Sequence, residues 1–150
     1  MMNAGELCSR IVVFAERDMG LAEAAGLMRD HHVGSLVVVD ETAGGRVPVG
    51  MLTDRDIAVA VVAKDVDPRT LRVGEIMSGD PITVLEQDSV LDALRLMRTR
   101  GVRRVPVTDA QGTLAGILAL DDVLEAVAEQ LGDLARAIAS ERAHEARVRP

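Results

Sequence analysis

Three side chains that can bind a phosphorylated sugar stand close together in the phrase GMLTDRDI, residues 50–57. Asp56 can accept hydrogen bonds from two adjacent ribose hydroxyls, each contributing roughly 1.5–3 kcal/mol because the carboxylate is charged. The Thr53 hydroxyl and the open N–H groups of a helix start suit an anion such as a phosphate, and Arg55 projects from the same turn. The spacing also fits a capping box, in which Thr53 caps an N–H and Asp56 reaches back, at about 1 kcal/mol. The residues alone leave both interpretations open, and the two roles can coexist.

A similar phrase, GILALDDV, occupies residues 116–123. It keeps the glycine and the final carboxylate, Asp122. It has Ala119 in place of the threonine and Asp121 in place of the arginine. A phosphate beside these residues would meet like charge with no cation to offset it. The second phrase therefore predicts a site that does not take a phosphate.

Both phrases belong to an internal repeat. A shift of 69 residues sets AEAAGLMRDHHVGSLVVVD (22–40) on LDALRLMRTRGVRRVPVTD (91–109), with seven identities. After the AGGR loop the shift becomes 66, and Gly50 then falls on Gly116. A register that holds through several elements and breaks once, in a glycine-rich loop, indicates a duplication.

Each copy predicts the element order β-α-β-β-α. A short first strand (11–15 and 81–85) precedes a helix with apolar residues at helical spacing, and Ser89 is the expected N-cap of the second of these helices. Two strands and a helix follow, at 35–40, 47–52 and 54–64 in the first copy and at 104–109, 114–119 and 121–131 in the second. Neither small sheet can bury both faces alone. We therefore expect an α/β (α+β) fold in which the two copies pack sheet against sheet about a pseudo-twofold axis.

The last helix is expected to extend from Asp121 to about Arg147, since only the tolerated Gly132 interrupts it. Its apolar residues recur at spacings of four, three and four: Val127, Leu131, Leu134 and Ile138. Such a two-heptad seam suits packing on the rest of the chain or on another chain.

Composition excludes several classes of protein. In a chain of 150 residues, 48% of them hydrophobic, a folded core is expected. The net charge of −7 argues against binding to nucleic acid or an anionic membrane, and one Phe with no Trp or Tyr provides no platform for stacking bases. A single cysteine, no signal-like start and no long apolar run predict a cytoplasmic protein without a membrane span.

No metal or catalytic site is predicted. His31 and His32 are adjacent at a helix end and point in different directions, and no cysteine cluster supports them as metal ligands. Cys8 aligns with Met77 of the second copy, which favours a packed apolar role. No Ser-His-Asp, Cys-His or phosphate-binding glycine-rich pattern occurs, and we expect no enzymatic activity.

The chain resembles a tandem pair of CBS (cystathionine-β-synthase) domains, a Bateman module, from Gly5 to about Leu131. The resemblance rests on MRDHHVGSLVVVD, GMLTDRDI, MRTRGVRRVPVTD and GILALDDV. It implies CBS repeats at 5–70 and 71–131 and a C-terminal helical extension at 132–150. Members of this family bind adenosine-containing ligands such as AMP, ADP, ATP or S-adenosylmethionine between paired domains, and they regulate a partner protein. The resemblance also implies a homodimer in which two modules form a flat disc.

The same resemblance implies one ligand site built from both copies. In it, the start of the second copy's first strand lines the adenine pocket, and the two arginines before the next strand face the phosphates. The arginines have an alternative role as solvent-facing charges beside an edge strand, and neighbours on a strand point to opposite faces. The expected site residues are Met51, Thr53, Arg55, Asp56, Pro81, Ile82, Thr83, Arg103 and Arg104.

A mirror site follows by the same symmetry. Its residues are Val12, Val13, Gly34, Ser35, Ala119, Asp121 and Asp122. It lacks the hydroxyl and both arginines, so we expect it to be degenerate, either empty or occupied by an adenosyl ligand without phosphate. Two functions remain: a non-enzymatic sensor of adenine nucleotides that signals to an unknown partner protein, and a constitutive dimerisation scaffold that binds no ligand.

Overall fold

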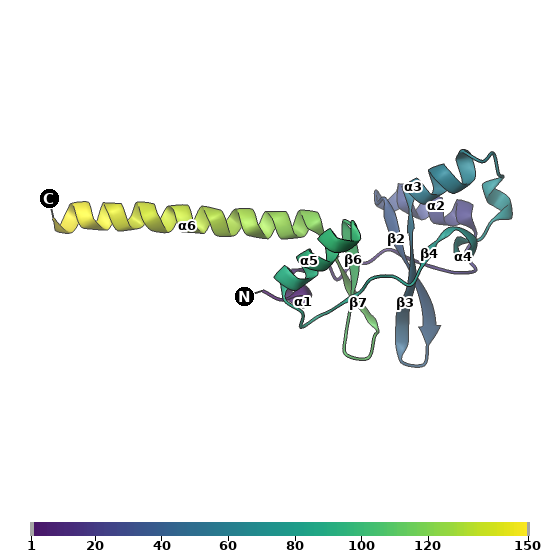
Figure 1. Cartoon of the computed structure of the whole chain (residues 1–150), viewed down its shortest axis with the longest axis horizontal. Coiled ribbons are helices and arrows are strands. Elements are labelled where there is room, and N and C mark those ends of the chain that lie inside the picture. The colour runs from purple at the N-terminus through teal and green to yellow at the C-terminus, as the bar shows by residue number, and fades with distance from the viewer. Residues whose placement is uncertain (1, 150) are drawn as a thin grey trace.

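Two small sheets stand side by side, and one long helix projects from the second of them (Figure 1). The computed structural model describes residues 2–149. The strands are β1 (Phe14–Glu16), β2 (Ser35–Thr42), β3 (Gly45–Thr53), β4 (Ser78–Gly79), β5 (Val84–Leu85), β6 (Arg104–Thr108) and β7 (Leu114–Ala119). The helices are α1 (Ala4–Leu7), α2 (Leu21–His31), α3 (Asp54–Ile57), α4 (Val73–Ile76), α5 (Val90–Arg100) and α6 (Leu120–Val148), with a π-helical turn at Ala58–Val62 and a 3₁₀ turn at Pro68–Thr70.

The two sheets repeat one another in register. The first has the order β1-β2-β3-β4 and the second β5-β6-β7, each opening with a parallel pair followed by an antiparallel one. Ser35 lies opposite Thr53 in the first sheet, and Arg104 lies opposite Ala119 in the second. These two pairs are related by the sequence shifts of 69 and 66. The predicted α/β duplication is therefore confirmed.

Helices α2 and α5 occupy equivalent places and bury equivalent faces. Leu21, Ala24 and Met28 are buried on α2, and the residues 69 positions later are buried on α5. Ser89 caps α5 as predicted, its Oγ accepting a hydrogen bond from the Asp92 N–H at 3.1 Å. Both helices end in a left-handed residue, Gly101 on α5 (φ 65°) and His32 on α2 (φ 53°). A glycine takes this conformation without steric cost, so the α5 terminus is the less strained of the two.

The two halves of the chain exchange their leading segments. Ala4 and Cys8 at the start of the chain lie in the core beneath the second sheet, and Ser9 bridges to Ile117 of β7. Val73 of α4, at the start of the second half, lies in the core beneath the first sheet, and β4 pairs with β3. Each half therefore completes the core of the other.

This exchange explains why both phrases begin with glycine. A Cβ on Gly50 would stand 2.7 Å from the backbone oxygen of Ser78, and one on Gly116 would stand 2.6 Å from that of Ser9. Real Cβ atoms do not approach a carbonyl so closely. The two glycines let the exchanged segments lie directly on β3 and β7.

Three element predictions differ from the structure. The first strands are shorter than expected: Ile11 is 87% exposed and strand structure begins at Phe14, while Pro81, Ile82 and Thr83 lie before β5 rather than in it. The residues just before Phe14 and Val84 connect the exchanged segments to the sheets of their own repeats. Strand pairing therefore begins only at Phe14 and Val84. The helix expected at 54–64 is α-helical only to Ile57 and continues as the π-helical turn.

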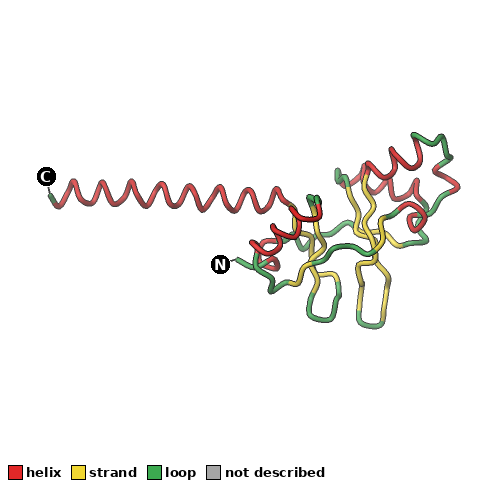
Figure 2. The backbone as a smooth tube through the Cα atoms, in the orientation of Figure 1, coloured by secondary structure: helices red, strands yellow, loops and turns green. Residues whose placement is uncertain are grey.

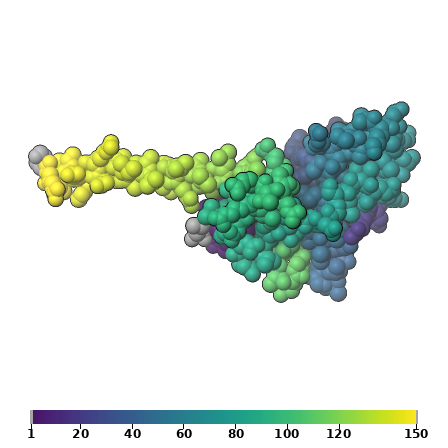
Figure 3. Space-filling view, in the orientation of Figure 1, coloured from purple at the N-terminus to yellow at the C-terminus, as the bar shows by residue number. Residues whose placement is uncertain are grey.

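Helix α6 is one continuous element, as predicted. It runs for 29 residues and buries only Val123, so most of its length stands clear of both repeats (Figures 2 and 3). The boundary expected at 131/132 falls inside this helix, and the domain division at 70/71 stays a prediction. No helix among residues 2–149 combines the length and the apolar character needed to span a bilayer.

Candidate functional site

A cleft of about 670 Å³ opens between the two repeats, where β3 ends and β6 begins. The first repeat contributes the end of β3, the first turn of α3 and the start of β2. The second repeat contributes the segment that joins α5 to β6. The lining residues are Gly34, Ser35, Met51, Thr53, Asp54, Arg55, Gly101, Val102, Arg103 and Arg104.

The cleft brings together five of the nine expected site residues, namely Met51, Thr53, Arg55, Arg103 and Arg104. Asp56 is the third residue of α3, where it caps the helix start, and it does not line the cleft. Pro81 and Ile82 are half-buried, Ile82 against the core of the second repeat, and Thr83 is exposed. The expected adenine-lining residues are therefore outside the cleft wall.

Thr53 and Asp56 form a complete capping box at the start of α3. The Thr53 Oγ1 accepts a hydrogen bond from the Asp56 N–H at 3.1 Å, and the Asp56 Oδ2 accepts one from the Thr53 N–H at 2.9 Å. Each group still has capacity, because the Thr53 hydroxyl can donate its proton and Asp56 Oδ1 can accept. The cap and a ligand contact are thus chemically compatible.

The second phrase keeps half of this cap. Asp122 Oδ2 accepts a hydrogen bond from the Ala119 N–H at 3.2 Å. Ala119 has no side-chain oxygen to return the bond. The carboxylate that both phrases share therefore has a structural role in both, and the two helix caps differ by the Thr53 hydroxyl.

The cleft is locally basic in an acidic chain. Its lining residues include Arg55, Arg103 and Arg104 but only one carboxylate, Asp54, whereas the whole chain carries a net charge of −7. Neither Arg55 nor Arg104 forms an ion pair with any part of the chain that the structure describes. Free guanidinium groups at the rim of a cleft are suited to phosphate oxygens.

Arg103 differs from the other two arginines. Its Nη2 lies 3.4 Å from Oδ1 of Asp121 in the first turn of α6, with both side chains largely exposed. Such an exposed pair contributes about 0–1 kcal/mol and exchanges readily with a competing anion. Asp121, expected in the mirror site, is therefore a neighbour of the main cleft through Arg103.

The expected mirror-site residues are spread over three places. Ser35 lines the cleft already described. Val12 lines a separate hollow of about 410 Å³ beside the strand hairpins, and Asp122 lines a groove between α1 and α6. Val13 packs on the core of the first repeat, and Ala119 is half-buried at the start of α6.

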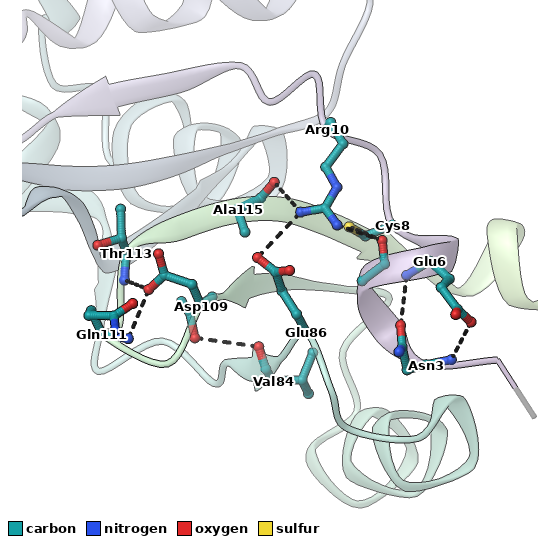
Figure 4. Close-up of polar contacts among 12 residues, drawn as sticks. Asn3, Glu6, Cys8, Arg10, Val84, Glu86, Asp109, Gln111, Thr113 and Ala115 are labelled. Carbon is teal, nitrogen blue, oxygen red and sulfur yellow. Dashed lines mark hydrogen bonds and ion pairs between the residues drawn. The ribbon is translucent and has the colours of Figure 1, made fainter.

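The arginines near the second hollow are engaged locally. Arg10 donates hydrogen bonds to the backbone oxygens of Gly5 and Ala115 and lies 3.4 Å from Glu86 (Figure 4). Arg46 lies 4.3 Å from the centre of the Phe14 ring and pairs with a glutamate of β2. These contacts hold the segments together and leave the hollow without free cations of the kind seen in the main cleft.

Cys8 and the histidines show no features of a reactive site. Cys8 is buried in the second core and its thiol contacts the backbone oxygen of Gly5, and burial raises the pKa of that thiol. A raised pKa leaves little nucleophilic thiolate at neutral pH. His31 and His32 are exposed at the end of α2. No cluster of three or more metal-ligating side chains occurs within residues 2–149.

The family model described as "CBS domain" matches residues 4–63 and 73–129. The chain belongs to the CBS-domain family. An uncharacterised protein of Methanopyrus kandleri is 36% identical over 124 residues, covering 83% of this chain and 62% of its own length. This chain therefore spans less than two thirds of that relative.

Two solved CBS structures share the fold and were determined with ligands. The CBS domain pair of MJ0100, in complex with 5′-methylthioadenosine and S-adenosyl-L-methionine, superposes with a TM-score of 0.75 at 25% identity, covering 87% of this chain and 98% of the other. CBSX2 in complex with AMP gives a TM-score of 0.73 at 25% identity, covering 86% of this chain and 98% of the other.

Some cleft residues were missed by sequence reasoning. Asp54 and the backbone turn at Gly101 and Val102 line the cleft, and Gly34 and Ser35 were expected in the mirror site instead. A Cβ on Gly34 would stand 3.1 Å from Oδ2 of Asp54, and the Asp54 N–H donates to the Gly34 oxygen. In the sequence, Gly34 stands just before a strand, where a small residue can face a helix start. That position alone does not show whether Gly34 lines the main cleft or the mirror site.

Proposed function

We propose that this protein is a non-enzymatic regulatory module that binds a phosphorylated adenosine ligand in the cleft between its repeats. The observation that carries the proposal is the charge of the cleft lining, where Arg55 and Arg104 have no ion-pair partner among residues 2–149 and the lining holds one carboxylate, in a chain of net charge −7. The ligands found with the two related structures, AMP and S-adenosylmethionine with methylthioadenosine, support the adenosine part.

The proposal gives each side chain a role. Arg55 and Arg104 bind the phosphate, and Arg103 joins them when it leaves Asp121. Thr53 donates its hydroxyl proton to a phosphate oxygen, and Asp56 accepts from the ribose hydroxyls with the oxygen that the cap leaves free. Pro81 and Ile82 form the apolar end that receives the adenine, which requires the ligand to reach past the rim of the cleft.

The mirror position is proposed to be unable to hold a phosphate. Ala119 offers no hydroxyl, and Asp121 and Asp122 place two carboxylates where the first repeat has one carboxylate and Arg55. We therefore propose one phosphate-binding site per chain.

Binding can signal because the cleft is formed by both repeats. A ligand that contacts α3 on one side and the start of β6 on the other favours the arrangement in which these two surfaces are close. The shift in population is limited to the ligand's difference in affinity between the two arrangements. A partner protein that reads this arrangement would be the regulated one.

A ligand panel tests the proposal. AMP, ADP, ATP, S-adenosylmethionine and NAD are added to the full chain, and melting is followed with an extrinsic dye because the chain has no Trp or Tyr. A ligand at 100 times its Kd raises the free energy of unfolding by about 2.7 kcal/mol. We expect a phosphorylated adenosine ligand to stabilise the wild type and calorimetry to give one site per chain.

Matched variants separate ligand contact from helix capping. Arg104→Gln removes a cleft cation, and Asp56→Asn removes a charge while leaving a side-chain oxygen to cap the Thr53 N–H. Both are expected to weaken binding at least tenfold. Arg46→Gln, at the second hollow, is the control and should bind as the wild type does. Two equivalent phosphate sites per chain, or binding unaffected by Arg104→Gln, would contradict the proposal.

The complete capping box favours a second candidate, a constitutive scaffold that binds no ligand. In it, Thr53 and Asp56 serve only the start of α3, through the two hydrogen bonds at 3.1 and 2.9 Å. A flat panel, with no stabilisation by any of the five ligands, would favour the scaffold.

A further inference from the structure

We propose that α6 is a dimerisation helix that pairs antiparallel with α6 of a second copy of this chain. The helix has 29 residues and buries only Val123 against the rest of the chain. Figure 3 shows it standing clear of the two repeats beyond its first turns. Most helical stability in proteins comes from packing of an apolar face, so a helix of this length with an uncovered face needs a partner. The inference does not depend on the proposed function.

The uncovered face is a regular apolar seam. Its side chains are between 44% and 70% exposed, and they recur at spacings of three, four, three and four: Leu124, Val127, Leu131, Leu134 and Ile138. This is the a/d pattern of a coiled coil. The seam spans about 21 Å at 1.5 Å per residue. Ala128 and Ala135 lie beside it, and their small side chains allow a second helix to approach closely.

The charges along α6 identify the partner and its direction. Residues 121–135 contain five acidic side chains and no Lys or Arg. Residues 136–149 contain four arginines and two glutamates. A parallel pair would set Asp121 beside Asp121 and Arg142 beside Arg142, whereas an antiparallel pair centred on the seam brings Asp121 of one copy near Arg142 of the other at both ends. The two ends of the seam are therefore complementary in charge in the antiparallel direction and repel each other in the parallel one.

The middle of the seam fixes the expected register. With Leu131 of both copies at the centre, Leu124 of one copy lies opposite Ile138 of the other. Arg142 then lies near Asp121 of the second copy, at the point where α6 leaves the body. An anionic membrane is a poorer occupant, because the flanks of the seam are acidic where such a surface would require Lys and Arg.

Cross-linking tests both the pairing and its direction. In a Cys8→Ala background, full-length Leu124→Cys and Ile138→Cys chains are mixed and oxidised, and the mass of the product is measured. We expect a disulfide-linked heterodimer from the mixture, and neither chain alone should cross-link efficiently. Efficient cross-linking of Leu124→Cys with itself would show a parallel pair and overturn the proposal. So would the absence of any cross-link from a protein that sediments as a monomer.

Two further variants separate the seam from the helix as such. Leu131→Asp with Leu134→Asp places charges in the seam and is expected to reduce the cross-link at least tenfold. Ser140→Asp, nine residues from Leu131 and so on the opposite face, should leave the cross-link unchanged. Retention of the cross-link in the double variant would overturn the proposal. The double variant should also bind the ligands of the panel as the wild type does, so the two proposals can fail separately.

Discussion

The two phrases GMLTDRDI and GILALDDV form equivalent corners of the two repeats, each the turn from a strand into a helix (β3 into α3, and β7 into α6). Of these two corners, only the first has residues that line the basic cleft. The residues that they share have structural roles. Gly50 and Gly116 admit the exchanged segments, and Asp56 and Asp122 accept a backbone hydrogen bond at a helix start. Of the five residues that differ, four line the cleft in the first repeat: Met51, Thr53, Asp54 and Arg55. Agreement between the repeats therefore marks groups that hold the scaffold, which for Asp56 is compatible with the ribose contact proposed above, and disagreement marks the phosphate end of the candidate site.

The difference extends to the facing strand. In the first repeat Gly34 faces the helix start that carries Arg55, whereas in the second repeat Arg103 faces the helix start that carries Asp121. The second corner neutralises itself through its own ion pair. The first corner leaves Arg55 without an ion-pair partner among residues 2–149. The two corners therefore differ in charge at both positions, with Gly34 and Arg55 in the first and Arg103 and Asp121 in the second.

The largest expected effect concerns the shared glycines. Gly50→Ala and Gly116→Ala each press a Cβ into a backbone oxygen at 2.7 or 2.6 Å, and each should lower the free energy of unfolding by about 1–3 kcal/mol. Gly26→Ala is the control, because nothing lies within 4 Å of its Cβ and it sits inside α2. It should raise stability by about 0.5–1 kcal/mol. Urea unfolding followed by circular dichroism measures all three. Equal effects in the three variants would contradict the exchanged arrangement.

The next effect concerns the hydroxyl that separates the phrases. Thr53→Ala removes a capping acceptor and should lower the free energy of unfolding by about 1 kcal/mol. Ala119→Ser adds the missing hydroxyl at a residue whose backbone is already extended (φ −107°, ψ 150°), and should raise it by about 0.5–1 kcal/mol. Thr53→Ser retains the cap and serves as the control. If Ala119→Ser has no effect in urea unfolding, the two helix starts are less alike than the register indicates.

A smaller effect concerns the ion pair of the second corner. Asp121→Asn releases Arg103, so binding of the phosphorylated ligand proposed above should tighten about twofold to fivefold, in line with the small energy of an exposed pair. Calorimetry measures the change in Kd. Asp133→Asn, which removes a charge farther along α6, is the control. An unchanged Kd in Asp121→Asn would mean that Arg103 takes no part in binding.

The element order could be predicted from the sequence because the apolar periodicity and the repeat both report on it. The repeat shifts of 69 and 66 relate the pair Ser35–Thr53 of the first sheet to Arg104–Ala119 of the second, and Ser89 was recognisable as a cap from its type and position. The path of the chain between elements could not be predicted in the same way. The exchange of the segments around Ser9 and Ser78 depends on contacts far apart in the sequence, and only the two glycines indicate it.

The candidate site was predictable in part for a related reason. Thr53, Arg55 and Arg104 meet because each stands at the end of a strand or the start of a helix, and the repeat fixes which ends are adjacent. The positions of Pro81 and Thr83 depend on how the chain crosses from β4 to β5, which no local pattern determines. The pairing of Arg103 with Asp121 required the actual distance between two exposed side chains.

The smallest expected effect is a pH dependence that only one repeat should show. The two hydrogen bonds from the Arg17 guanidinium, at 2.9 and 3.1 Å, hold the pKa of the Asp40 carboxyl below its ordinary value. Because the folded-state pKa is lowered, this stabilisation is present above the pKa of the unfolded chain and is lost as the pH falls through the folded value. The equivalent carboxylate of the second repeat, Asp109, has Glu86 at the position of Arg17 and accepts backbone N–H bonds instead.

Melting temperatures of the wild type and Asp40→Asn should therefore differ at pH 7 and converge on acidification. Added salt at 1 M should reduce the difference at pH 7, because the pair is exposed and screened. Arg17→Gln should reproduce the effect of Asp40→Asn, and the double variant should add little to either, since both remove the same interaction. If the difference in melting temperature persists unchanged to low pH, the charge of Asp40 is not what stabilises the fold. The charge asymmetry between the repeats would then be confined to the cleft.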